Sequence, residues 1–247
     1  MRIEDQDLAF LANCTDAELD PFIDILLDKD RQGRVSSELQ QTTRYKFLYP
    51  QHSLYVDLIV HELLKFGGNS IANFFRGGKG VPYKELLCDV CDSMGVNYNS
   101  HAAVERIEDC LLAKVLEKAW DAMSEEERRK VLESIGCKPH AVGGITSSVM
   151  IALFRRGGFA SYKFVLIMVN AIWRSIFGRG LSLVANKTIC QVLAIGTGPI
   201  GLSLSAVWTA IDIASPAMRV IVPGAVYVAT LRRMKTEEAA LAILQSA

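Results

Sequence analysis

The residues best spaced for chemistry are three glycines in a charge-free stretch of the C-terminal half. Gly196, Gly198 and Gly201 match the spacing of dinucleotide-binding turns, where the backbone approaches a pyrophosphate at a helix N-terminus. That fingerprint also needs an acidic residue about 20 positions later to bind the ribose. Asp212 comes too early and Glu237 too late, and the remaining chain is too short for a doubly wound sheet. We therefore expect no cofactor and predict a tight turn between packed helices, with a dinucleotide-binding enzyme as the alternative.

Three other groups resemble chemical sites less closely. Cys88 and Cys91 have the spacing of a redox or metal motif, but no second cysteine pair accompanies them. His61 has no evident partner, which favours a structural role. The loop 76–80 (RGGKG) resembles an anion-binding loop but lacks the full P-loop pattern. The sequence thus predicts structural thiols in a reducing cytoplasm, no catalytic residue and no metal ligand.

The elements that must position these residues are predicted to be helices throughout, giving an all-α fold. Thr15 with Glu18, and Ser124 with Glu127, have the spacing of capping boxes. Pro21 offers a later start for the first helix. A third capping pattern predicts a helix over 37–49. The predicted apolar stripe of the next helix consists of Leu54, Leu58, Ile59, Leu63 and Phe66, and we expect Gly67 and Gly68 to end it by adopting the left-handed conformation.

Charge divides the chain of 247 residues unevenly, although the formal net charge is zero. Residues 1–137 hold 16 basic and 24 acidic residues, whereas 138–235 hold 11 basic residues and a single acid. We predict a small helical module over 1–35, an acidic helical domain over 36–137 and a basic, apolar, Gly-punctuated helical region over 138–247. Helices in this last region are expected at about 145–156, 159–177, 182–195, 199–213 and 217–234.

Basic and aromatic residues recur between the apolar runs of this last region. The interaction candidates are Arg155, Arg156, Lys163, Trp173, Arg174, Arg179, Lys187 and Trp208. Such a pattern is typical of helices lying in a membrane interface, with cationic side chains reaching phosphate and Trp at headgroup depth. The alternative is a buried domain with its arginines at the surface. The charge-free run 188–211 is long enough to span a bilayer, but the Gly-Pro turn within it favours two short helices.

Three motifs of the sequence resemble those of a known family. The run 66–90 (FGGNSIANFFRGGKGVPYKELLCDV), the Gly-Pro-x-Gly turn and the closing ATLRRM resemble the YaaW-type family of bacterial proteins over nearly the whole chain. Residues 66–73 are the most specific part, and the first 35 residues resemble the small N-terminal domain of that family. Some members carry a label linking them to ubiquinol–cytochrome c chaperones. The resemblance therefore implies an assembly factor rather than an enzyme, and it brings no catalytic residues.

These observations together favour a non-enzymatic cytoplasmic protein. We expect it to associate peripherally with the inner membrane, through an anionic membrane surface or a membrane-linked protein, and not with nucleic acid, because apolar residues far outnumber the charges between them. A soluble chaperone-like or adaptor module is the alternative.

Overall fold

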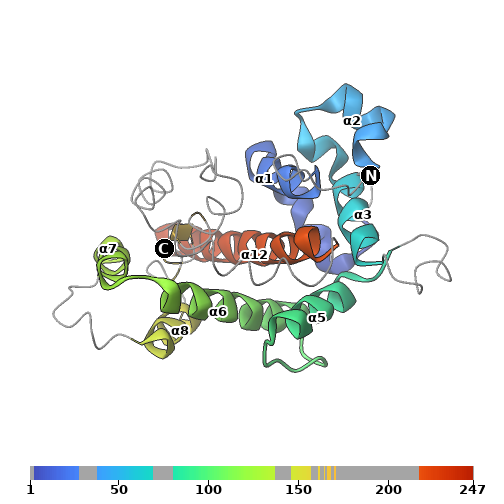
Figure 1. Ribbon diagram of the computed structural model, residues 1–247. Helices are drawn as coiled ribbons and strands as arrows, with labels where there is room; N and C mark the ends of the chain where they lie inside the picture. The colour runs from blue at the N-terminus through green and yellow to red at the C-terminus, as the bar shows by residue number, and fades with distance from the viewer. Residues whose placement is uncertain are drawn as a thin grey trace. The chain divides into compact units, whose positions relative to one another are not determined.

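The computed structural model describes residues 3–27, 38–68, 80–136, 146–156, 161, 164, 166–167, 170 and 217–246. These residues contain helices and turns but no strand, which confirms the predicted all-α class (Figure 1). The α-helices are α1 (Asp16–Leu27), α2 (Thr43–Leu48), α3 (Val56–Gly67), α5 (Tyr83–Met94), α6 (Val104–Ala122), α7 (Glu125–Ser134), α8 (Ser147–Arg156) and α12 (Met218–Ser246). The described residues also form 3-10 helices: η1 (Gln6–Asn13) before α1, η2 (Leu39–Gln41) before α2, and η3 (His52–Tyr55) between α2 and α3.

The predicted capping boxes set the start of two helices. Glu18 Oε2 accepts the backbone N–H of Thr15 at 2.7 Å, and Thr15 Oγ1 accepts the N–H of Glu18 at 3.3 Å. α1 therefore begins at Asp16, and Pro21 lies inside the helix instead of starting it. Ser124 forms the same reciprocal box at the start of α7. These bonds satisfy N–H groups that a helix N-terminus otherwise leaves unpaired.

The single helix predicted over 37–49 is wrong. The chain forms η2 and then α2, because Thr42 is extended and its hydroxyl accepts the N–H of Tyr45 at 3.2 Å, which begins a new helix. Leu54 is also misassigned, since it lies in η3 with 47% of its surface exposed, outside the buried face of α3.

α3 ends at Gly67 as predicted, but for a different reason. Gly68 has a φ of −86°, so neither glycine closes the helix with the left-handed conformation that we expected. A Cβ on Gly67 would lie 2.8 Å from Cδ1 of Leu86 and 2.9 Å from Cγ2 of Val81. Gly67 is thus needed for the close approach of the chain that enters α5.

The chain forms two compact units. Unit 1 comprises residues 1–108 and 211–228, with 12 basic and 18 acidic residues, a net charge of −6. Unit 2 comprises residues 109–210 and 229–247, with 15 basic and 9 acidic residues, a net charge of +6. The excess positive charge therefore belongs to one structural unit.

The first part of α12 packs in the core of unit 1. The ring of Tyr227 lies 6.1 Å from that of Phe22, and its hydroxyl donates to the carbonyl of Glu18 at 2.9 Å. A Cβ on Gly224 would lie 2.9 Å from Cδ1 of Leu63. Within unit 1, these contacts join residues from all three predicted segments of the chain.

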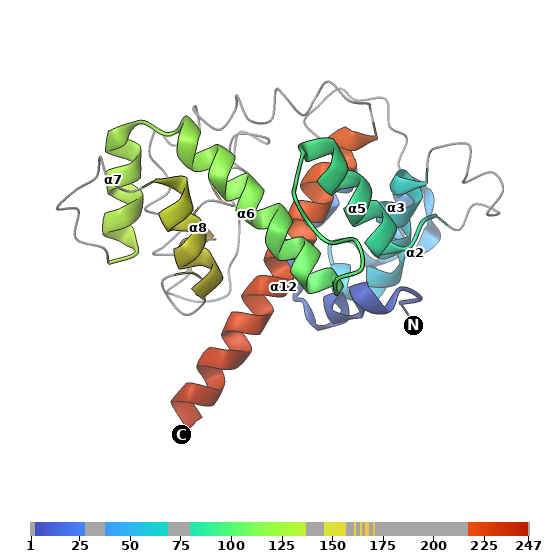
Figure 2. The same cartoon turned by 90° about the horizontal axis from the view of Figure 1, so that it is seen from below.

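Unit 2 is built around Trp120 of α6, which is 1% exposed. Its ring lies 6.4 Å from that of Phe164 and 5.6 Å from the guanidinium of Arg128, whose Nε donates to the Trp120 carbonyl at 2.9 Å. Figure 2 shows α7 and α8 near the C-terminal end of α6. α12 does not end at residue 234 as predicted but continues to Ser246 through residues 237–245, which are rich in the helix formers Glu, Ala and Leu. Arg233 and Glu237 pair across one turn of this extension at 3.0 Å.

Candidate functional site

The predicted interaction residues that the structure describes are Arg155 and Arg156, both exposed at the C-terminal end of α8. The others, Lys163, Trp173, Arg174, Arg179, Lys187 and Trp208, lie outside the described residues, as do the glycines Gly196, Gly198 and Gly201. Their assigned roles therefore stay predictions.

The exposed face of α8 is small, apolar and cationic. Its exposed residues are Ser148, Val149, Ala152, Arg155 and Arg156, whose spacing places them on one side of the helix. Half of the surface of Val149 is exposed. Two arginines in the last turn also complement the negative end of the helix dipole. We define these five residues as the α8 face.

A partly buried arginine, Arg233, holds the opposite side of α8 in place. Phe154 is fully buried, and its carbonyl accepts from Ser161 Oγ at 2.9 Å and from Arg233 Nη2 at 3.2 Å. The guanidinium of Arg233 also lies 5.0 Å from the centre of the Phe154 ring. Its remaining contacts are with Asp109 at 3.4 Å and Glu237 at 3.0 Å. This Arg233 cluster orients α8 so that its two C-terminal arginines are exposed.

This geometry suits the binding of anions. A guanidinium presents a planar set of donors to phosphate or carboxylate oxygens and stays charged at any physiological pH. The sequence from 138 to 211 contains no acidic residue, so no local carboxylate in that stretch neutralises Arg155 and Arg156. The α8 face is thus a candidate contact for an anionic surface.

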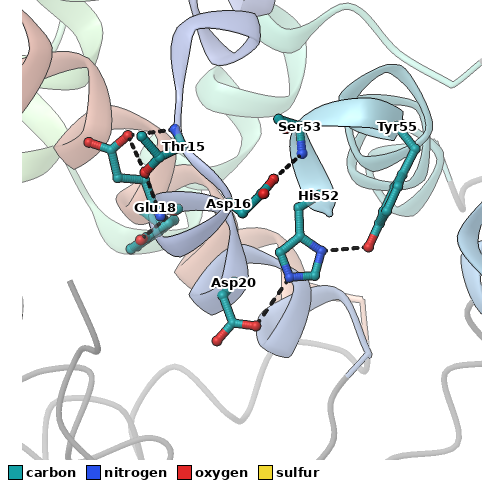
Figure 3. Close-up of polar contacts among 8 residues, drawn as sticks. Thr15, Asp16, Glu18, Asp20, His52, Ser53 and Tyr55 are labelled. Carbon is teal, nitrogen blue, oxygen red and sulfur yellow. Dashed lines mark hydrogen bonds and ion pairs between the residues drawn. The ribbon is translucent and has the colours of Figure 1, made fainter. Parts of the chain in front are cut away.

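A second polar cluster lies in unit 1, where α1 meets η3 (Figure 3). His52 is 1% exposed, its Nε2 lies 3.2 Å from Oδ1 of Asp20, and its Nδ1 lies 2.5 Å from the hydroxyl of Tyr55. Asp16 Oδ1 accepts the backbone N–H of Ser53 at 2.7 Å. We refer to these five residues as the His52 cluster.

One placement of the ring proton of His52 pairs the polar atoms of this cluster. A proton on Nε2 is donated to Asp20, and the unprotonated Nδ1 accepts from Tyr55. Burial, the largest cause, raises the pKa of the Tyr55 hydroxyl, so that it remains a donor. The N–H of Ser53 lowers the pKa of Asp16, so that it remains a charged acceptor. Because Tyr55 is fully buried, this arrangement joins helices and does not present a reactive group to a substrate.

Unit 1 also contains a hollow of about 400 Å³, lined by Glu4, Asp5, Asp57, Leu58, Val60, His61 and Leu64. Two of its carboxylates, those of Asp5 and Asp57, already bind groups of the protein itself. Asp5 accepts the N–H groups of Asp7 and Tyr83, and Asp57 binds Arg44 through both oxygens. We assign no ligand to this hollow.

The described residues contain neither a metal-binding cluster nor a membrane-spanning helix. No group of three or more His, Cys, Asp or Glu side chains in that part of the chain is placed to hold a metal ion. None of the described helices is both long and apolar enough to cross a membrane.

Known proteins identify the family. A UPF0174 protein of Helicobacter pylori strain J99 is 40% identical over 238 residues, which cover 95% of this chain and 93% of the relative. The chain belongs to the UPF0174 family. A second UPF0174 protein of that strain is 38% identical over 205 residues, covering 81% of this chain and 98% of the relative. The UPF0174 protein YaaW of Escherichia coli K12 is 29% identical over 239 residues, which cover 94% of this chain and 95% of the relative.

The YaaW-type resemblance expected from the sequence is thus confirmed. No family model matches the chain, and no solved structure matches it. Membership in the UPF0174 family assigns no role to any residue, so the sites in this member depend on its own geometry.

Sequence reasoning missed both buried clusters. It considered His61, which is exposed, instead of His52. A usable signal was present, since His52 lies among Tyr45, Tyr49 and Tyr55 and has Tyr55 at the spacing of one helical turn. Arg233 was counted only as one charge among eleven, because its acidic partner Asp109 is 124 residues away in the sequence.

Proposed function

We propose that this UPF0174 protein is a non-enzymatic cytoplasmic protein that attaches peripherally to an anionic membrane surface, with the α8 face as one point of contact. The observation that carries the proposal is the exposed pair Arg155 and Arg156 beside Val149, on a helix whose other side is fixed by Arg233. The net charge of +6 on unit 2 supports it, because phospholipid headgroups attract such a surface.

The expected strength of this contact follows from its charges. Each Lys or Arg near an anionic surface contributes about 1 kcal/mol, so the two arginines contribute about 2 kcal/mol, or about thirtyfold in affinity. Lys163, Arg174, Arg179 and Lys187 add to this attraction if they also reach the headgroups.

The test is sedimentation of the full chain with vesicles of phosphatidylcholine, with and without phosphatidylglycerol. We expect Arg155→Gln/Arg156→Gln to weaken binding to the anionic vesicles about thirtyfold. The matched control is Arg129→Gln/Lys130→Gln on α7, which removes the same charge from a helix that begins with three glutamates. This control should change the affinity less than about threefold, since its charges lie among acids.

Two outcomes would count against the proposal. Equal losses of vesicle affinity in the two double variants would show that only the total charge of the protein matters. The α8 face would then not be a specific contact. Complete recovery of the wild-type chain from the soluble fraction of cells at every salt concentration would favour the soluble adaptor alternative instead.

A further inference from the structure

The second exposed surface lies on α2 and η3, at the edge of unit 1 in Figure 1. α2 buries none of its six side chains. Phe47 is 82% exposed, Tyr49 is 48% exposed and Leu54 is 47% exposed, and Pro50 between them is exposed as well. We call Phe47, Tyr49, Pro50 and Leu54 the aromatic corner. A single exposed ring is normal on a protein surface, whereas apolar side chains exposed together as a patch mark a site of interaction.

The aromatic corner is held firmly in position. The guanidinium of Arg44 binds Asp57 of α3 at 2.7 and 3.0 Å and donates to the carbonyl of Leu54 at 2.8 Å. Behind the exposed side chains, Tyr45 lies 5.5 Å from Tyr49 and 5.7 Å from Tyr55 between ring centres. The ring of Tyr49 also lies 5.7 Å from that of His52. The corner is therefore preorganised, and binding would cost little ordering entropy.

The chemistry of the corner suits a phospholipid headgroup layer. Residues 39–56 include Arg44 and Lys46 but no acidic residue, and Lys46 is exposed next to Phe47. Interfacial segments combine these types: an apolar ring reaches the acyl boundary, a phenol stays among the headgroups, and a lysine reaches phosphate.

The net charge of unit 1 limits how this contact can work. With −6 overall, unit 1 is not attracted as a whole to an anionic membrane. Charge at a distance is screened within about 8 Å at physiological salt. The acids that contact α2 and η3 have partners there, Asp57 with Arg44, Asp16 with the N–H of Ser53 and Asp20 with His52, whereas Lys46 is exposed beside Phe47. Phosphate is present in every phospholipid, and apolar insertion does not require a net anionic lipid.

We infer that the aromatic corner is a second membrane contact, which inserts Phe47 and Leu54 into the headgroup layer of a phospholipid bilayer while Lys46 binds lipid phosphate. This inference rests on the proposed membrane attachment. It concerns unit 1 instead of unit 2, and the contact depends on apolar burial instead of attraction between charges. The α8 face depends on anionic lipid, whereas the corner binds neutral phosphatidylcholine as well.

The experiment uses the full chain and the same two vesicle types. Phe47→Gln/Leu54→Gln should lower partitioning into pure phosphatidylcholine vesicles about tenfold through the loss of apolar burial. Ile243→Gln is the matched control, because Ile243 is 69% exposed on α12 and lies outside the corner. It should leave partitioning unchanged. Circular dichroism should show the double variant as folded as wild type, since both replaced side chains are largely exposed.

A reporter variant locates the contact directly. In Phe47→Trp, the emission of the new indole, taken as the difference from wild type, should shift to the blue on adding vesicles of either composition. No shift, together with unchanged partitioning of Phe47→Gln/Leu54→Gln, would overturn the inference but leave the α8 face intact if anionic binding still needs Arg155 and Arg156. A wild-type chain that binds neither vesicle type would overturn both proposals.

Discussion

α8 and α2 both present an exposed face, but the chain holds them by opposite means. α8 buries Met150 and Phe154 and is fixed by Arg233, a charged group with two carboxylates and a carbonyl as partners. α2 buries nothing and is positioned by Arg44 and by edge-to-face contacts of the Tyr45, Tyr55 and His52 rings. A short helix without a core face of its own thus relies on polar and aromatic contacts made by its neighbours.

This difference predicts which replacements harm each unit. His52 and Tyr55, which hydrogen-bond each other in the His52 cluster, are 1% and 0% exposed, so losing one leaves a buried polar atom of the other without its partner. Arg233 has more access to water, because 17% of its side chain is exposed. We therefore expect larger losses in unit 1 than in unit 2.

The largest effect is expected for His52→Leu. It leaves the buried Tyr55 hydroxyl without its acceptor and removes the ring contact with Tyr49, so the free energy of unfolding should fall by about 3 kcal/mol. His61→Leu is the matched control, since His61 is exposed on α3, and it should cost less than about 0.5 kcal/mol. Urea denaturation followed by circular dichroism measures both values. Equal losses for the two variants would show that the His52 cluster does not stabilise unit 1.

Arg233→Met should have the next largest effect, about 2 kcal/mol, because Asp109, Glu237 and the Phe154 carbonyl lose a shared donor. The three tryptophans, Trp120, Trp173 and Trp208, all belong to unit 2, so intrinsic tryptophan fluorescence follows this unit. Arg233→Lys should recover less than half of the loss, since an ammonium cannot match the fork of the guanidinium. Full recovery by lysine would mean that charge alone matters at this position.

The contrast between the two clusters also explains what the sequence could predict. The capping boxes at Thr15 and Ser124 and the helix ends at Gly95 and Gly136 were predictable, because each depends on residues three or four positions apart. Gly95 and Gly136 adopt positive φ angles of 64° and 84°, which glycine tolerates best.

The α8 face and the aromatic corner were less predictable, because their orientation depends on contacts that are distant in sequence. Arg155 and Arg156 were found from charge alone, but their outward orientation comes from Arg233, 79 residues after Phe154. The aromatic corner was missed because Leu54 fitted a helical apolar stripe. Only the 3-10 turn of η3, fixed by His52 and Arg44, shows that it points elsewhere.

The smallest predicted effect tests the charged edge of the His52 cluster through its pH dependence. The N–H of Ser53 lowers the pKa of Asp16 from its ordinary value of 3.8, and His52 contributes a smaller lowering. A carboxyl whose pKa is lower in the folded state stabilises the fold fully above the unfolded pKa, and this contribution is lost as the pH falls through the folded value. Asp16→Asn should therefore cost about 0.5 to 1 kcal/mol at neutral pH, because Asp16 is partly exposed.

The difference in the free energy of unfolding between wild type and Asp16→Asn should stay constant at neutral pH. It should begin to shrink below about pH 4, where the carboxyl of the unfolded chain becomes protonated, and continue to shrink as the pH falls through the lower pKa of the folded state. Urea midpoints measured from pH 3 to pH 7 would show this trend. Asp121→Asn, which removes the same charge from an exposed position of unit 2, should show no comparable loss at neutral pH. A stability difference between wild type and Asp16→Asn that grows toward low pH would contradict this prediction. It would mean that the charged carboxyl does not stabilise the fold, and that His52 and Tyr55 alone join α1 and η3.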